Sequence, residues 1–157
     1  MTIGELAEQA GVSTRTLRFW ADERLIPCDR TVAGYRSFWD AYLRAADPMD
    51  PTNPVLAAHA SGDELRQVQQ TFAGHFQRGE VIRGTLDLRP RVTAQTESTA
   101  TVTDCYGDST HIFDAATGRQ KDPPESVRYL VTATMAVEGG VWKVTAMKKE
   151  GEACIPT

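Results

Sequence analysis

The sequence lacks any long hydrophobic run. None of its 157 residues belongs to an apolar stretch that approaches the ~20 residues a membrane-spanning helix needs. The first residues include Glu5 and Glu8, and no apolar segment follows them, so they do not resemble a secretory signal peptide. We therefore expect a cytoplasmic protein that has no membrane partner.

Cysteine and histidine are scarce, with three of each in the chain. No Cys-x-x-Cys pair and no Cys–His spacing of the kind that binds zinc occurs, so we expect neither a metal nor another cofactor. Internal repeats and low-complexity tracts are also lacking. A content of 41% hydrophobic and 24% charged residues fits two small domains in one chain.

An excess of basic charge is missing as well, because the formal net charge is −4. In the first 46 residues, six arginines are balanced by six acidic side chains. The arginines are Arg15, Arg18, Arg24, Arg30, Arg36 and Arg44, and the acidic residues are Glu5, Glu8, Asp22, Glu23, Asp29 and Asp40. Long-range attraction to nucleic acid should therefore be modest and sensitive to salt.

The first 38 residues have the pattern of a helix, a sharp turn, a second helix and a two-stranded wing. Apolar residues recur at helical spacing from Ile3 to Ala10, and Gly11 follows where a left-handed backbone ends a helix. Ser13 is a favourable N-cap for the second helix. That helix carries Leu17 and Trp20 on one face and Thr14, Arg15 and Arg18 elsewhere. This pattern predicts a recognition helix for a DNA major groove.

The same segment resembles the winged helix-turn-helix of the MerR family of transcription regulators. The shared motifs are IGELAEQAGVSTRTLRFW, RLIP and GYRSF, over about the first quarter of the chain. The resemblance implies that Arg18 and Arg36 hold phosphates and that Tyr35 packs or contacts the DNA backbone at the wing. Thr14, Arg15 and Thr16 would face bases or phosphates. Two features depart from the family: Phe19 and Trp20 replace its usual tyrosines, and its long dimerisation coiled coil is missing.

After Pro54 the pattern changes to that of an α+β domain. Residues 63–77 are predicted to form an amphipathic helix with Leu65, Val68, Phe72 and Phe76 on its buried stripe. From residue 81 the apolar period becomes two, and strands are expected at about 81–94, 99–106, 127–137 and 141–149. We expect helices that cover one side of a curved antiparallel sheet.

Residues 38–154 resemble the nuclear transport factor 2-like, or SnoaL-like, domains of exported actinobacterial proteins. The resemblance rests on FWDAYLRAADP, TATVTDCYGDS, DAATG, VTATM and GGVWKVT, together with a cysteine near the end. It implies a cone-shaped domain. We place the DNA-binding domain at 1–46 and the cone domain at 47–157, with helix 38–46 shared between them.

Two cysteines point to different cellular compartments for the two expected domains. Cys105 and Cys154 match positions that the exported relatives possess, and a bond between them would tie the C-terminal tail to the sheet. Disulfides are rare in a reducing cytoplasm, which favours two free thiols. Both readings stay open here, with free thiols favoured.

Catalysis has candidates but no motif. The acidic and histidine candidates for a general base, and the tyrosines that could donate hydrogen bonds, are Asp40, Asp104, His59, His75, His111, Tyr42 and Tyr106. Since none lies in a recognisable catalytic pattern, we do not expect an enzyme.

A pocket for a small apolar ligand is the alternative to catalysis. Its expected aromatic lining is Trp39, Tyr42, Phe72, Phe76 and Trp142. These aromatic residues could equally fill the hydrophobic core. Threonines at period two in two strands could form a flat face for a second copy of the chain, or simply a solvated face.

The sequence thus favours a sequence-specific transcription regulator that binds double-stranded DNA. Its C-terminal domain is expected to form a homodimer, to sense a small apolar ligand, or both. One alternative is a non-catalytic binding module of the exported type that carries a grafted helix-turn-helix. A second alternative is a SnoaL-like isomerase or cyclase.

Overall fold

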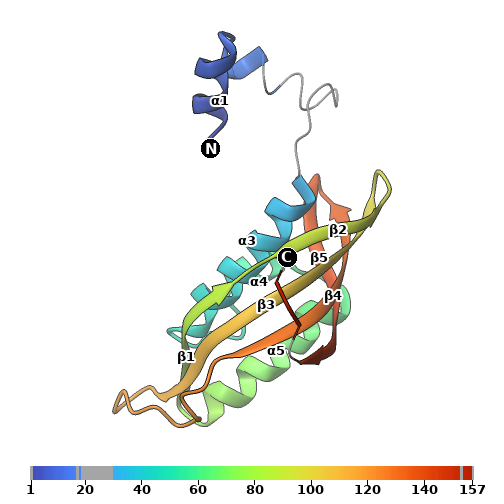
Figure 1. The fold of residues 1–157 in the computed structure, drawn as a ribbon. Helices are drawn as coiled ribbons and strands as arrows, with labels where there is room; N and C mark the ends of the chain where they lie inside the picture. Colours follow the sequence, from blue (N-terminus) through green and yellow to red (C-terminus); the bar gives the residue numbers. More distant parts are fainter. Residues whose placement is uncertain (1, 17, 19–29, 153, 157) are drawn as a thin grey trace. The chain divides into compact units, whose positions relative to one another are not determined.

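The computed structural model describes residues 2–16, 18, 30–152 and 154–156. The chain divides into two compact units, residues 1–30 and residues 31–157 (Figure 1). The predicted boundary lies after residue 46, whereas the structure assigns residues 31–46 to the second unit.

The first unit begins with α1 (Ile3–Ala10), which is capped at both ends. Thr2 and Glu5 form a capping box, in which the Thr2 hydroxyl accepts from the Glu5 backbone N–H. Gly11 ends the helix with a φ of 65°, a left-handed conformation that favours glycine. The Ser13 hydroxyl accepts a 3.1 Å hydrogen bond from the Thr16 backbone N–H, as an N-cap does. These contacts confirm the first predicted helix and the start of the second, whereas Leu17 and Trp20 lie outside the described residues.

The second unit packs helices on an antiparallel sheet, which confirms the predicted α+β class. Its helices are α3 (Arg30–Ala46), α4 (Pro54–His59) and α5 (Gly62–Gln77). Its strands are β1 (Glu80–Asp87), β2 (Pro90–Gln95), β3 (Thr99–Asp114), β4 (Val127–Glu138) and β5 (Val141–Glu152). The strand order is β1-β3-β4-β5, and β2 also pairs with β3. Figure 1 shows α3 and α5 along one side of this sheet.

The predicted wing is wrong, because Gly34, Tyr35 and Arg36 lie within α3. Tyr35, Phe38 and Trp39 recur at helical spacing and are buried in the core, with relative exposures of 0%, 1% and 8%. A Cβ on Gly34 would lie 2.7 Å from the Trp142 Cβ, so the glycine permits a close approach of α3 to β5. Burial of this apolar face in the sheet explains why the segment is helical here.

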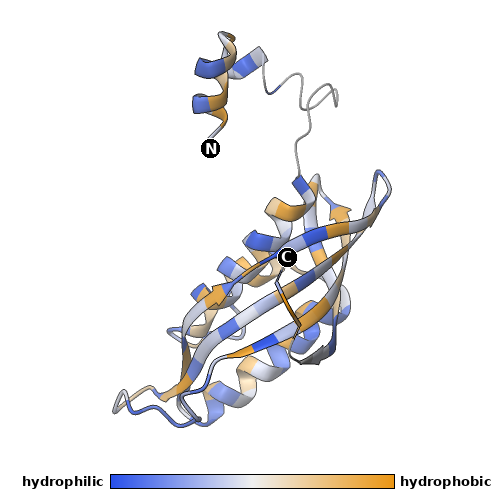
Figure 2. Ribbon diagram, viewed as in Figure 1, coloured by the Kyte–Doolittle hydropathy of each residue, from blue (hydrophilic) through white to orange (hydrophobic). Residues whose placement is uncertain are grey.

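The amphipathic helix α5 is confirmed, but its buried face is rotated from the predicted one. Glu64, Val68, Phe72 and His75 are buried, whereas Phe76 is 62% exposed. In Figure 2 hydrophobic and hydrophilic stretches alternate along α5. Successive residues of a helix are about 100° apart around its axis. Because His75 points into the core, the next residue, Phe76, points towards solvent.

The register of β3 on β4 gives the sheet two different faces. Ala100, Val102, Asp104 and Tyr106 point into the core, with relative exposures between 0% and 4%. Thr99, Thr101 and Thr103 alternate with these residues, and Thr101 pairs with Thr134 and Thr103 with Thr132 on β4. We call the five residues Thr99, Thr101, Thr103, Thr132 and Thr134 the threonine face. The prediction that the threonines of the two strands lie on one face of the sheet is confirmed, because residues paired across antiparallel strands lie on the same side.

A disulfide joins Cys105 in β3 to Cys154 in the C-terminal tail, with a Cα–Cα distance of 5.8 Å. The expectation of two free thiols is therefore wrong. The alternative left open by the sequence, a bond between Cys105 and Cys154, is the one observed. Cys105 is 9% exposed. The bond therefore holds the tail beside β3. Figure 1 draws this C-terminal tail in dark red.

Candidate functional site

The first candidate site is the beginning of the second helix in the N-terminal unit. Thr14, Arg15, Thr16 and Arg18 are helical, and Thr14, Arg15 and Arg18 are exposed. The half-buried Thr16 hydroxyl lies 2.8 Å from the Ser13 hydroxyl, within the helix cap. A helix N-terminus that presents threonine and arginine side chains suits phosphate oxygens and base edges.

Two further residues of the predicted DNA site lie in α3, and only one is accessible. Arg36 is exposed and stays available to a phosphate. Tyr35 is fully buried, and its hydroxyl donates a 2.7 Å hydrogen bond to Asp104 Oδ2. The predicted contact of Tyr35 with DNA is corrected, because its side chain belongs to the core of the second unit.

Asp104 is a structural group in this fold. The Tyr35 hydroxyl and the Arg89 backbone N–H donate to its two carboxylate oxygens, both at 2.7 Å. Burial raises the pKa of Asp104, and the two hydrogen bonds act in the opposite direction. Burial and the nearby Asp104 charge raise the pKa of the Tyr35 hydroxyl. This pair ties α3 to β3 and to the turn between β1 and β2.

The second candidate site is a pocket of about 510 Å³ between α3, α5 and the sheet. We call it the cone pocket. Its apolar and aromatic lining is Trp39, Tyr42, Val68, Leu86, Tyr106 and Met147. Its polar lining is Glu64, Gln67, Thr71, Asp108, Thr110 and Lys149. The volume lies in the range of small-molecule sites, and the lining divides equally between apolar or aromatic and polar residues.

Glu64 is the unusual group of the cone pocket. It is only 7% exposed, and among the described residues it has no hydrogen-bond or ion-pair partner. Burial raises its pKa from an ordinary 4.5 to about 7. A buried carboxyl that lines a pocket without a protein partner is suited to a ligand that can supply the missing partner.

The other charged groups of the cone pocket already have partners. Asp108 accepts hydrogen bonds from the Thr110 backbone N–H at 2.8 Å and from its hydroxyl at 2.6 Å. The Lys149 ammonium lies 3.9 Å from the ring centroid of Tyr129, over its face. Glu64 therefore differs from both in having its charge unmatched.

The structure brings two of the five predicted pocket residues together. Trp39 and Tyr42 line the cone pocket, with ring centroids 5.3 Å apart. Phe72 packs behind Tyr42 in the core at 4.8 Å, and Trp142 contacts Gly34. Phe76 is exposed. Phe72 and Trp142 thus pack in or against the hydrophobic core, which is the alternative that the sequence left open for these aromatic residues.

Sequence reasoning missed the charged lining of the cone pocket. Glu64 precedes Val68 by four residues, so both share a helix face, and that spacing is the signal that could have identified it. Asp108 lies on β3 in phase with the buried Asp104 and Tyr106, so its inward position could have been inferred. Lys149 is an exposed residue of β5, and no such pattern marks it.

Most of the catalytic candidates lie away from the cone pocket. Only Tyr42 and Tyr106 line it; the five others, Asp40, Asp104, His59, His75 and His111, do not. His75 Nδ1 lies 2.7 Å from the Glu80 carboxylate, which also accepts from Lys121 and Arg78. These donors, Lys121 first, lower the pKa of Glu80 to about 2. His111 Nδ1 lies 3.5 Å from Asp122.

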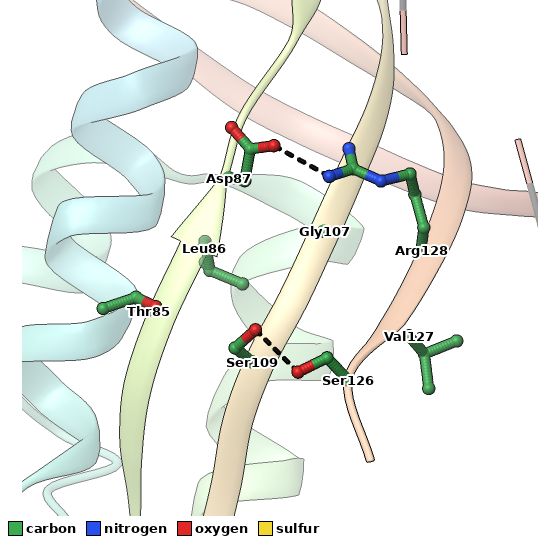
Figure 3. A pocket seen from close by; sticks show the side chains of 8 residues that line it. All are labelled: Thr85, Leu86, Asp87, Gly107, Ser109, Ser126, Val127 and Arg128. Atoms are coloured by element: carbon green, nitrogen blue, oxygen red, sulfur yellow. Dashed lines mark hydrogen bonds and ion pairs between the residues drawn. The ribbon is translucent and has the colours of Figure 1, made fainter. Parts of the chain in front are cut away.

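A smaller hollow of about 320 Å³ lies near the ends of β1 and β4, with its lining shown in Figure 3. An Asp87–Arg128 ion pair at 2.8 Å and a Ser109–Ser126 hydrogen bond at 2.8 Å span it. Both charged side chains and both serines of the hollow are thus already partnered. In the described part of the chain, no group of three or more Cys, His, Asp or Glu side chains could hold a metal ion, and no helix could cross a membrane.

Comparison with known proteins supports the two-part reading. Residues 2–38 match the family described as MerR family regulatory protein, so the predicted resemblance is confirmed for that segment. The match ends inside α3, at the buried Phe38. No curated protein matches the chain.

Two solved structures resemble the chain over its C-terminal unit. The intermembrane space region of chloroplast protein ARC6 has a TM-score of 0.61 and 17% identity, and the match covers 79% of this chain and 98% of that one. A ketosteroid isomerase-like protein from Erwinia carotovora atroseptica SCRI1043 has a TM-score of 0.46 and 14% identity, with 79% and 99% covered. At these identities the likeness concerns the fold alone. The chain therefore carries a segment similar to MerR regulators at residues 2–38, followed by an α+β unit that shares its fold with the ARC6 region.

Proposed function

We propose that the protein is a sequence-specific DNA-binding transcription regulator whose second unit forms a homodimer and binds a small molecule. The observation that carries the proposal is the match of residues 2–38 to MerR regulators, with Thr14, Arg15 and Arg18 exposed at the start of the second helix. The protein acts on DNA and not as an enzyme, and the cytoplasm is where it meets its operator.

The residues have distinct roles in this proposal. Arg18 and Arg36 neutralise phosphates and set the position of the unit on the duplex, which affects all sequences alike. Arg15, helped by Thr14 and Thr16, reads base edges, for which a bidentate contact to guanine suits arginine. The base contacts select the operator, whereas the phosphate contacts supply affinity.

The first prediction concerns Arg18. We expect Arg18→Ala to weaken DNA binding on every sequence and to reduce the slope of log affinity against log salt by about one, because one phosphate contact is lost. Gel shifts over a range of salt concentrations measure both quantities. Arg66→Ala removes an exposed arginine from α5 and is the matched control. Unchanged affinity and slope in Arg18→Ala would exclude the phosphate contact.

The dimer is proposed to form through the threonine face. A single small unit makes few base contacts, whereas two units on a twofold axis can reach half-sites about one helical turn apart. The Thr134 side chain is exposed at the centre of this face. Such a surface of β-branched side chains can meet its own copy across a symmetry axis.

The second prediction tests that interface. We expect the fragment 31–157, which contains the whole second unit, to be dimeric by light scattering at tens of micromolar. Thr134→Arg should make it monomeric, because two like charges would meet at the axis. Gln70→Arg adds the same charge to the exposed side of α5 and should leave the dimer intact. A folded, monomeric fragment alongside a dimeric full chain would show that the interface lies elsewhere.

A second candidate function is favoured by the disulfide. In it the second unit is a non-catalytic binding module of the exported type, and residues 1–30 add little. The Cys105–Cys154 bond and the burial of Tyr35 in the second unit both suit this reading, since disulfides persist in oxidising compartments. A gel shift with a library of duplexes separates the two candidates, because only the regulator selects a sequence.

A further inference from the structure

We infer that the cone pocket binds a hydrophobic organic cation, that is, a quaternary or protonated amine, or its phosphonium equivalent, on an aromatic or aliphatic body. The inference names the ligand class of the small-molecule site in the proposed function. It concerns the second unit alone, so it can be tested without DNA.

The walls of the cone pocket supply a connected aromatic surface. The Trp39 ring centroid lies 5.3 Å from that of Tyr42 and 5.4 Å from that of Tyr106. Val68, Leu86 and Met147 complete the apolar lining. Faces of tryptophan and tyrosine attract cations through their quadrupoles, and the attraction grows when water is excluded. The lining therefore suits a cation that also has a hydrophobic body.

The charges of the lining favour a cation over an anion. Glu64 and Asp108 are two carboxyl groups, whereas Lys149 is the single cationic side chain among the described lining residues. The Lys149 ammonium is already held over the Tyr129 ring. A cationic ligand would give the buried Glu64 the partner that no described residue provides.

The titratable groups that line the cone pocket together with Glu64 are Tyr42 from α3, Tyr106 and Asp108 from β3 and Lys149 from β5. The β1 strand contributes only Leu86 to the lining. Burial raises the pKa of Glu64 to about 7, so the empty pocket holds a proton at lower pH. A bound cation favours the carboxylate and releases that proton. Binding should therefore weaken as pH falls from 8 to 6.

The test uses the full chain and two ions of nearly equal size and opposite charge. Isothermal titration at pH 8 with tetraphenylphosphonium should show saturable binding, and tetraphenylborate should bind at least tenfold more weakly. Benzyltrimethylammonium serves as a smaller second cation. Saturable binding of either cation, with the anion rejected, supports the inference. Absence of binding for both cations up to millimolar concentration, or preference for the anion, overturns it.

The variant Glu64→Gln tests whether the Glu64 carboxylate binds the cation. It keeps the size of the side chain and removes the charge, so cation affinity should fall about tenfold or more and lose its dependence on pH. Asp63→Asn makes the same change at a neighbouring exposed carboxylate of α5 and should have no effect. Equal cation affinity in Glu64→Gln and the wild type would overturn the inference.

The variant is expected to fold. A carboxyl whose pKa is higher in the folded state stabilises the protein below pH 4.5 and loses that contribution as pH rises through 7. Removal of the charge should therefore not lower the thermal midpoint at pH 8, which circular dichroism checks. Gel shifts without any cation test the proposed function separately, so a failure of either idea can be recognised.

Discussion

Reduction of the Cys105–Cys154 disulfide is expected to lower the free energy of unfolding by about 4 kcal/mol. The two cysteines are separated by 49 residues, and cross-linking a loop of this length removes a corresponding amount of conformational entropy from the unfolded chain. The closed loop contains most of β3 and all of β4 and β5. We therefore expect the midpoint of urea unfolding to shift substantially on reduction.

The measurement is urea unfolding followed by tryptophan fluorescence, with and without dithiothreitol. The double variant Cys105→Ser, Cys154→Ser should match the reduced wild type and should not respond to the reductant. Cys28→Ser leaves the pair in place and serves as the control. If reduction leaves the wild-type midpoint unchanged, the bond does not contribute to stability.

Replacement of Tyr35 by alanine is expected to destabilise the second unit by about 3–5 kcal/mol. The ring is fully buried between α3 and the sheet, and its loss leaves a cavity of the kind that buried aromatic truncations create. The change also removes the hydroxyl that donates to Asp104, itself 1% exposed. A buried carboxylate oxygen without its donor adds to the penalty.

Two variants separate the parts of this effect. Tyr35→Phe keeps the ring and loses the hydrogen bond, so it should cost about 1–3 kcal/mol. Arg36→Ala changes the exposed neighbour on α3 and should alter stability by less than about 0.5 kcal/mol. Chemical denaturation of the fragment 31–157 measures all three. Tyr35→Ala with wild-type stability would mean that the Tyr35 side chain does not contribute to the core of the second unit.

Together these two results bear on the choice between the candidate functions. A large loss on reduction would mean that the second unit depends on the bond for much of its stability, and such bonds persist in oxidising compartments. Trapping of free thiols in cells that produce the protein shows which state it adopts there. Sequence-selective gel shifts with the thiols reduced would establish that the regulator functions without the bond.

The cone pocket was only partly predictable from the sequence. Trp39 and Tyr42 could be named because aromatic residues in an amphipathic helix point to the domain interior. Glu64 was not named although it shares a helix face with Val68, since a carboxylate next to an apolar stripe normally faces water. Its burial depends on how α5 is rotated about its axis against the sheet. The apolar residues Leu65 and Phe76 predict a different rotation from the one observed.

Local interactions account for what the sequence by itself determined. The capping box of Thr2 and Glu5, the left-handed Gly11 and the alternation along β3 depend on residues a few positions apart, and all are legible in the printed sequence. The match to MerR regulators over residues 2–38 is of the same local kind. Only the tertiary structure decided the rest, because the partners lie far apart in the chain. Tyr35 finds Asp104 across 69 positions, and Cys105 finds Cys154 across 49. Burial against those distant partners makes GYR part of a helix and leaves Glu64 alone in its pocket.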